Sequence, residues 1–69
     1  MMYNVEYIKQ LRKTNGYTMN YVADSMKVSL RHYDRLEKGH TPLNANHIEA
    51  MIKLYPTMEL NELFNYNLK

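Results

Sequence analysis

Arg31 and Arg35 are four residues apart in this 69-residue sequence, a spacing that places two side chains on one face of a helix. An arginine on an exposed helix can donate two parallel hydrogen bonds to O6 and N7 of guanine. Leu30 beside them can make only apolar contacts, for instance with a thymine methyl group. Surface ion pairs with Asp34 or Glu37 are the alternative use of the two arginines. The candidate base-reading surface consists of Ser29, Leu30, Arg31, Asp34 and Arg35.

Polar residues on either side of this helix are candidates for binding phosphate. A helix that starts after Asn44 would offer free N–H groups to a phosphate oxygen at its N-terminus. Thr18 and Asn44 are also good N-cap residues, and capping is compatible with phosphate contact because cap residues lie at the surface. The candidate phosphate contacts are Thr18, Asn20, Lys38, His40, Thr41 and Asn44.

The residue pattern argues against catalytic and metal chemistry. No two of the three histidines, His32, His40 and His47, have the i, i+4 spacing of a zinc pair, and the chain has no cysteine. The sequence also contains no paired-carboxylate arrangement, nucleophile motif or glycine-rich phosphate loop. We expect no metal site, no cofactor and no enzymatic activity.

The net charge of +2 is unevenly distributed. Up to His40 the chain carries seven basic and four acidic residues, whereas residues 41–69 carry two basic and three acidic residues. The positive half therefore contains Arg31 and Arg35, as binding to nucleic acid requires. Ordinary solvated helix faces are the alternative, and this alternative applies best to Lys9, Lys13 and Lys53.

Four expected helix starts share one signature. An apolar residue directly precedes the N-cap residue, and a second apolar residue lies four positions after the cap. The N-cap residues are Asn4, Thr18, Ser29 and Asn44. The predicted helices cover residues 5–14, 19–26, 30–38 and 45–55. Pro56 ends the fourth helix because proline has no N–H group. A fifth helix is predicted over 58–65, and no sustained alternation predicts a strand, so the fold class is all-α.

Residues 18–38 are predicted to form two short helices joined by a tight turn, within one domain that spans residues 1–69. Ala23 would lie where these helices cross, and a small residue there lets their backbones approach closely. Glu37 is expected to hold the end of its helix and the following loop. The expected core comprises Ile8, Leu11, Val22, Ala23, Met26, Val28, Tyr33, Leu36, Ile48, Met51, Ile52, Tyr55, Leu60 and Leu63.

The sequence resembles the phage Cro and repressor helix-turn-helix family, the lambda-repressor-like DNA-binding domains. The resemblance implies a compact five-helix domain that binds a double-stranded DNA operator as a homodimer. It also implies a sequence-specific transcriptional regulator of phage or prokaryotic type, with helix 30–38 in the major groove. The matching residues are Ile8, Leu11, Arg12, Gly16, Tyr17, Thr18, Val22, Ala23, Val28, Ser29, Tyr33, Leu36, Glu37, Gly39 and the segment 60–64.

Three positions depart from the family pattern. Met19 stands where the family commonly has glutamine, and Leu30 where it has a residue able to reach a base edge. Lys27 stands where the family commonly has a glycine in a left-handed conformation, which costs a lysine about 1 kcal/mol. Exposed methionine, tyrosine and leucine are typical of adaptable protein-binding surfaces, and Met19, Tyr21 and Leu30 form such a candidate surface. The alternative function is therefore a phage modulator or antirepressor that binds a repressor protein, with an antitoxin as a third possibility.

The length and hydropathy of the chain predict where the protein acts. No apolar run approaches the roughly 18 residues of a membrane span, and no charged-then-apolar leader begins the sequence. We expect a cytoplasmic or nucleoid-associated protein with no membrane partner. Residues 66–69 are expected to be frayed or to take part in a dimer contact.

Overall fold

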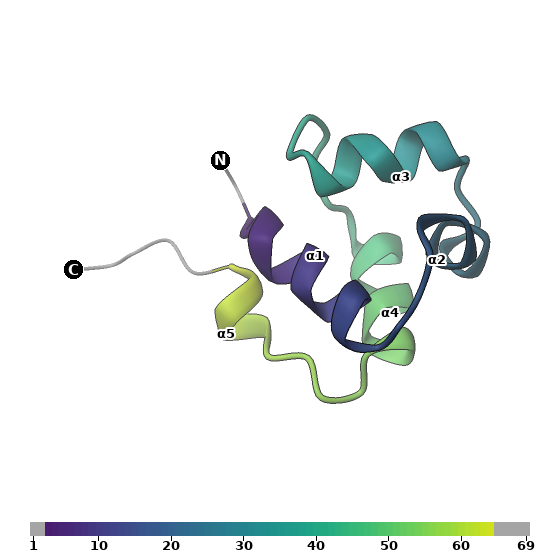
Figure 1. The fold of residues 1–69 in the computed structure, drawn as a ribbon. Helices are drawn as coiled ribbons and strands as arrows, with labels where there is room; N and C mark the ends of the chain where they lie inside the picture. Colours follow the sequence, from purple (N-terminus) through teal and green to yellow (C-terminus); the bar gives the residue numbers. More distant parts are fainter. Residues whose placement is uncertain (1–2, 65–69) are drawn as a thin grey trace.

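The computed structural model describes residues 3–64, and five helices lie within that range (Figure 1). The described residues contain no strand, so the prediction of an all-α fold is confirmed. The helices are α1 (Val5–Thr14), α2 (Met19–Met26), α3 (Leu30–Glu37), α4 (Ala45–Leu54) and α5 (Leu60–Leu63).

The first four helices start where the N-cap signature predicted. In each case the side-chain oxygen of the cap accepts a hydrogen bond from the N–H group three residues later, at 2.8–3.1 Å. Such a cap stabilises a helix by about 1 kcal/mol, because it satisfies one of the N–H groups that the first turn leaves unpaired. The caps are Asn4, Thr18, Ser29 and Asn44.

The predicted ends of the later helices were less accurate. Helix α3 ends at Glu37, one residue earlier than predicted, because Gly39 adopts a left-handed backbone with φ 78° that terminates the helix. Helix α4 also ends one residue early, because Tyr55 precedes Pro56 and is pushed out of the helical region. Helix α5 starts at Leu60 rather than at residue 58. Its predicted end at residue 65, like the tail 66–69, lies outside the described residues.

Helices α2 and α3 form the predicted helix-turn-helix. Ala23, which is 2% exposed, lets them pack closely. Lys27 ends α2 in the left-handed conformation, with φ 61° and ψ 40°. The next residue, Val28, donates its N–H group to the Ala23 carbonyl at 3.0 Å, so the chain turns and starts α3 at once.

Residues from all five helices and from the segment before α1 build the core. Two core predictions were wrong, because Ile52 and Leu60 are each 47% exposed. On α4 the inward face carries His47 and Met51, so Ile52 points to solvent and Ile48 is half-buried. Leu11 and Val28 are also half-buried. The buried apolar residues are Tyr3, Ile8, Val22, Ala23, Met26, Tyr33, Leu36, Met51, Tyr55 and Leu63.

The two ends of the described chain meet on α1. The N–H group of Asn4 donates to the Leu63 carbonyl at 2.8 Å, and the Glu59 N–H group donates to the Tyr7 hydroxyl at 2.8 Å. These bonds hold α5 against α1 (Figure 1). Within residues 3–64, no helix combines the length and apolar character that crossing a membrane requires.

Candidate nucleic-acid interface

The outer surface of α3 carries the residues predicted to read bases. Tyr33 and Leu36 turn into the core, 2% and 1% exposed, and this fixes which side of the helix faces outward. Leu30 is 45% exposed on that outer side. Ser29, Arg31 and Arg35 are also exposed, whereas Asp34 is half-buried.

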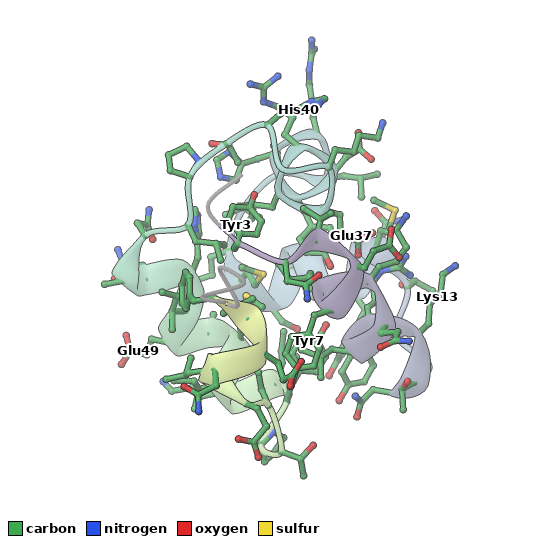
Figure 2. The ribbon with its side chains drawn as sticks, turned by 90° about the vertical axis from the view of Figure 1, so that its left-hand side faces the viewer. Tyr3, Tyr7, Lys13, Glu37, His40 and Glu49 are labelled. Atoms are coloured by element: carbon green, nitrogen blue, oxygen red, sulfur yellow. The ribbon has the colours of Figure 1, made fainter. Side chains whose placement is uncertain are left out.

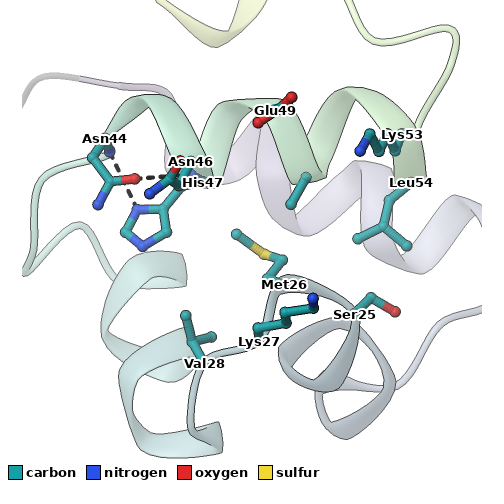
Figure 3. Close-up of a pocket in the computed structure, with 11 residues that line it drawn as sticks. Ser25, Met26, Lys27, Val28, Asn44, Asn46, His47, Glu49, Lys53 and Leu54 are labelled. Atoms are coloured by element: carbon teal, nitrogen blue, oxygen red, sulfur yellow. Dashed lines mark hydrogen bonds between the residues drawn. The ribbon is translucent and has the colours of Figure 1, made fainter.

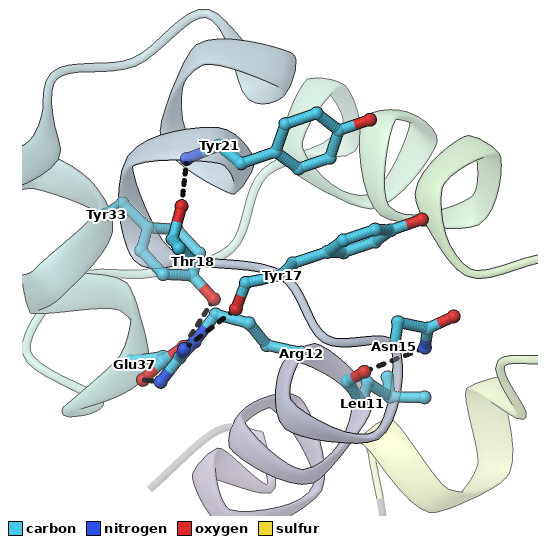
Figure 4. Close-up of polar contacts among 8 residues, drawn as sticks. All are labelled: Leu11, Arg12, Asn15, Tyr17, Thr18, Tyr21, Tyr33 and Glu37. Atoms are coloured by element: carbon cyan, nitrogen blue, oxygen red, sulfur yellow. Dashed lines mark hydrogen bonds and ion pairs between the residues drawn. The ribbon is translucent and has the colours of Figure 1, made fainter.

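A buried ionic network fixes α3 against α1 (Figure 4). The Arg12 guanidinium donates from Nε to Glu37 Oε2 and from Nη2 to Oε1 at 3.3 Å, and its Nη1 donates to the Tyr17 carbonyl at 3.2 Å. The Tyr33 hydroxyl donates to the same Glu37 carboxylate. The hydrogen bond to Glu37 raises the pKa of Arg12, and burial followed by the hydrogen bond to Glu37 raises the pKa of Tyr33.

Glu37 is thus structural, although its partners differ from those expected. It holds α1 and the inner face of α3 rather than the loop after α3. Its carboxylate is also unavailable to the two outward arginines. Asp34, the other expected partner, pairs instead with Lys38 Nζ at 3.1 Å.

The two arginines differ in how their guanidinium groups are used. Arg35 Nη2 donates to the His40 carbonyl at 3.2 Å, which ties this side chain to the loop after α3. Within residues 3–64, no hydrogen bond or ion pair engages the Arg31 side chain. The five N–H donors of Arg31 therefore remain available to a ligand.

A groove of about 700 Å³ lies between the starts of α2 and α3. Met19 and Leu30 give it an apolar part, and Arg31 and Asp34 give it charge. The groove brings together residues that the sequence assigned separately to bases, phosphates and a protein partner. Its predicted members are Thr18, Met19, Asn20, Leu30, Arg31 and Asp34.

A smaller groove of about 270 Å³ extends this surface towards α1. It shares Met19 and Asp34 with the first groove, and Lys9, Lys13 and Lys38 supply its basic lining. Sequence reasoning assigned Lys9 and Lys13 to an ordinary solvated face. Their i, i+4 spacing was the available signal, but only the packing of α1 beside α3 shows that they continue the basic surface. Figure 2 shows Lys13 on the outside of the molecule.

Other predicted phosphate contacts lie apart from these grooves. Asn44 lines a third groove of about 600 Å³ between α2 and α4, together with Lys27 and His47 (Figure 3). Thr41 is half-buried, and its carbonyl accepts a hydrogen bond from Tyr3 at 2.7 Å. His40 is exposed in the loop after α3 (Figure 2).

The protein-binding surface predicted from Met19, Tyr21 and Leu30 is not gathered in one groove either. Met19 and Leu30 share the 700 Å³ groove. Tyr21 is 51% exposed and packs on the Tyr17 ring, with ring centroids 4.7 Å apart (Figure 4). Tyr17 itself lines the groove, so Tyr21 lies behind one wall of it.

A family model described as helix-turn-helix matches residues 8–63, most of the chain. The protein belongs to the Cro/repressor-type helix-turn-helix family. Comparison with curated proteins and with solved structures gave no match. The match supports DNA binding and regulation by this helix-turn-helix domain.

The three departures from the family pattern have different structural consequences in this helix-turn-helix domain. Lys27 takes the left-handed backbone that the family assigns to glycine, so the turn geometry is kept at a cost in stability. Met19 is half-buried and Leu30 exposed at the groove, so they alter the surface rather than the fold. The scaffold of the family is therefore intact.

The histidines of the helix-turn-helix domain do not gather into a cluster of metal ligands. Within the described part of the chain, no three His, Cys, Asp or Glu side chains are grouped to hold a metal ion. His32 and His47 nevertheless come together, with Nε2 atoms 3.4 Å apart, although they are 15 residues apart in sequence. Local spacing gives no sign of this pair, because the two residues lie on different helices.

Proposed function

We propose that the protein is a sequence-specific transcriptional regulator of phage or prokaryotic type, a single domain over residues 1–69 that inserts α3 into the major groove of DNA. The observation that carries this proposal is Arg31, an exposed guanidinium with no partner among residues 3–64, at the start of a helix whose inner side is locked in the core. Arg31 can donate to guanine O6 and N7, and Leu30 beside it can contact a thymine methyl group.

The phosphate contacts in this proposal lie on both sides of α3. Thr18 and Asn20 stand at the N-terminus of α2, where free N–H groups attract a phosphate oxygen. The lysines of the smaller groove neutralise the backbone on the other side, and they give affinity without sequence information. Asn44 lies further from α3, in the groove between α2 and α4. We assign phosphate contact to Lys9, Lys13, Thr18, Asn20, Lys38, His40 and Thr41.

We also propose that the protein binds its operator as a homodimer. A two-fold dimer presents two recognition helices to successive major grooves, which doubles the contacts with a palindromic site. Ile52 and Leu60 are large apolar side chains that the monomer leaves about half exposed, and burial in a dimer would remove them from water. Measurement of the mass in solution tests this point. Ile52→Lys and Leu60→Lys should shift a dimer towards monomer without unfolding it.

Binding to duplex DNA over a range of salt concentrations tests the main proposal. The protein should bind random duplex at micromolar affinity or better in low salt, with a steep loss as salt rises. Selection from a random duplex pool should then recover a preferred operator. Absence of binding at low salt, with the protein folded, would exclude DNA reading. The proposed site of action is the cytoplasm, with no enzymatic activity and no cofactor.

One observation favours a second candidate function. The groove of about 700 Å³ has an apolar lining from Met19 and Leu30, which suits an apolar side chain of a partner such as a phage repressor protein. In that case Met19→Gln and Leu30→Gln should each weaken the complex by about 1–3 kcal/mol, because an amide would be buried without a partner. In a DNA complex the same changes should be tolerated. A pull-down against a co-encoded repressor, with a mobility shift in parallel, separates the two functions.

A further inference from the structure

Two imidazole rings join the recognition helix to the start of α4. His32 on α3 and His47 on α4 face each other with Nε2 atoms 3.4 Å apart, ring centroids 5.3 Å apart and an interplanar angle of 49°. His47 is 7% exposed, and His32 is half-buried. Across this contact the recognition helix meets a buried, titratable side chain.

The hydrogen bonds of His47 determine which of its nitrogens carries the proton. Its ring Nδ1 accepts a hydrogen bond from the backbone N–H group of Asn44 at 3.2 Å. The backbone N–H group of His47 in turn donates to Asn44 Oδ1 at 2.8 Å (Figure 3). This reciprocal pair is the capping box of α4. Because Nδ1 is an acceptor, neutral His47 carries its proton on Nε2, and this N–H group donates a hydrogen bond to Nε2 of His32.

Protonation of His47 breaks its capping contact with Asn44, and protonation of both rings also breaks the contact between them. Imidazolium carries protons on both nitrogens, so Nδ1 no longer accepts from Asn44. If His32 is protonated as well, two positive rings face each other 3.4 Å apart. Each histidine also stands in the first turn of its helix, where the helix dipole disfavours positive charge.

The charged groups around the pair do not offset this cost. On α4, Glu49 points away from the His47 ring (Figure 3), and Lys53 lines the same groove as His47. Lys27 approaches from the end of α2 and adds positive charge. On α3, Asp34 is paired with Lys38, and the neighbours of His32 include Arg31. Burial and then the charge of His32 lower the pKa of His47 below its ordinary value of 6.5.

We propose that His47 is a positioning residue for the recognition helix, and that protonation of the His32–His47 pair in a mildly acidic medium loosens the contact between α3 and α4 and weakens operator reading. The effect on DNA rests on the proposed function, whereas the effect on α3 does not. The device makes the protein a DNA reader that is sensitive to acid, at a pH below the ordinary histidine pKa of 6.5.

An NMR titration of the full chain tests the contact without DNA, with a chelator present so that a metal ion bridging the rings plays no part. The His47 ring should titrate below the ordinary histidine pKa of 6.5, and the α3 amide signals should move with the same midpoint. His47→Gln keeps an acceptor for the Asn44 N–H group but does not titrate, so the part of the α3 response that has the His47 midpoint should disappear. His32→Gln leaves the cap of α4 intact and provides a second variant. His40→Gln is the control for this DNA-free titration, and its α3 signals should follow pH as they do in the parent.

Two results would overturn the proposal: α3 signals that do not change with pH, or signals that follow pH equally in His47→Gln. A second arm measures the ratio of the affinities for the selected operator and for a scrambled duplex. Protonated histidines near phosphates raise both affinities alike, so this effect cancels in the ratio. The ratio should fall about fivefold or more on acidification in the parent and stay constant in His47→Gln. An equal fall in both proteins would refute the effect on DNA reading. A protein that binds no DNA would instead refute the proposed function, and the NMR arm would still decide the contact.

Discussion

The Arg12 guanidinium on α1 and the Glu37 carboxylate on α3 form a doubly hydrogen-bonded ion pair across 25 residues of sequence. The two side chains are 12% and 4% exposed, so the pair is largely withdrawn from water. Tyr33 and the Tyr17 carbonyl occupy further positions on the carboxylate and the guanidinium. Because all of these bonds lie on the inner side of α3, they fix the rotation of the helix and leave Arg31 and Leu30 outside.

Replacing Glu37 with glutamine should therefore destabilise the protein strongly. The change leaves the Arg12 charge buried without its counter-ion, a loss of about 3–5 kcal/mol for a buried pair. Urea unfolding of the variant measures this loss. Asp34→Asn is the matched control, because it breaks the exposed pair with Lys38 and should cost about 0–1 kcal/mol. Equal stability losses in the two variants would contradict the structural role of Glu37.

The helix starts could be predicted from sequence because capping is local. A polar side chain such as Ser29 or Thr18 and an N–H group three residues later are enough to specify it. The inward face of α4 could not be predicted in the same way. Its apolar residues, which include Met51 and Ile52, are compatible with two neighbouring stripes, and packing against α2 selected the stripe of His47 and Met51.

The candidate site was predictable in part for the same reason. The outward position of Arg31 followed from the inward position of Tyr33, a relation within one helix. Three other features depend on contacts between elements. They are the basic lining from Lys9 and Lys13, the hydrogen bond from Arg35 to the His40 carbonyl, and the facing histidines. Such contacts leave no signature in local spacing, so the sequence alone did not indicate them.

Arg31→Ala and the double change Lys9→Ala, Lys13→Ala should affect DNA binding differently. Loss of Arg31 should cost about 1–3 kcal/mol on the selected operator and relax the preference at one base pair, because a bidentate contact to a base is removed. Loss of the two lysines should weaken all duplexes similarly and make binding less dependent on salt, because phosphates carry no sequence information. Mobility shifts on operator and scrambled duplexes at several salt concentrations measure both effects. An unchanged base preference for Arg31→Ala would show that Arg31 is not a reader.

Leu30 should contact a thymine methyl group if α3 reads the major groove. Uracil lacks only that methyl group, so replacing the contacted thymine should weaken binding by about 0.8 kcal/mol, roughly fourfold. Leu30→Gln should bind the thymine and uracil operators equally well. The measurement is a competition between operators with single thymine-to-uracil changes. If no position discriminates in the parent protein, Leu30 does not lie against a thymine methyl group.

Tyr55 makes stability sensitive to alkaline pH. Its side chain is 1% exposed, and burial raises the pKa of its hydroxyl from 10.0 to about 12. The fold favours the neutral phenol, so this stabilising contribution is complete below pH 10 and is lost as pH rises towards 12. Tyr55→Phe should lose less stability over that range in urea unfolding than the parent. Tyr21→Phe is the control. Tyr21 is 51% exposed, so loss of its hydroxyl should change the pH dependence of stability little.

The same change should also act at neutral pH. The Tyr55 hydroxyl is buried with no hydrogen-bond partner among residues 3–64, and a buried unpaired polar group costs about 1–3 kcal/mol. Tyr55→Phe removes that group and keeps the ring beside Tyr17, whose centroid lies 5.9 Å away. We expect equal or greater stability in the variant. A loss above about 1 kcal/mol would mean that the hydroxyl is satisfied in solution.

Lys27→Gly should stabilise the protein. Lys27 holds φ 61° and ψ 40°, and a left-handed backbone costs a residue with a Cβ atom about 1–2 kcal/mol, whereas glycine adopts it freely. Part of this gain is offset because glycine also loses more chain entropy on folding, so the net gain should be about 1 kcal/mol or less. Asp24→Gly is the matched control. It lies exposed inside α2 and should destabilise the protein by about 0.5–1 kcal/mol. Urea unfolding of both variants checks the opposite signs, and a destabilised Lys27→Gly would mean that the lysine side chain makes a contact that outweighs the backbone cost.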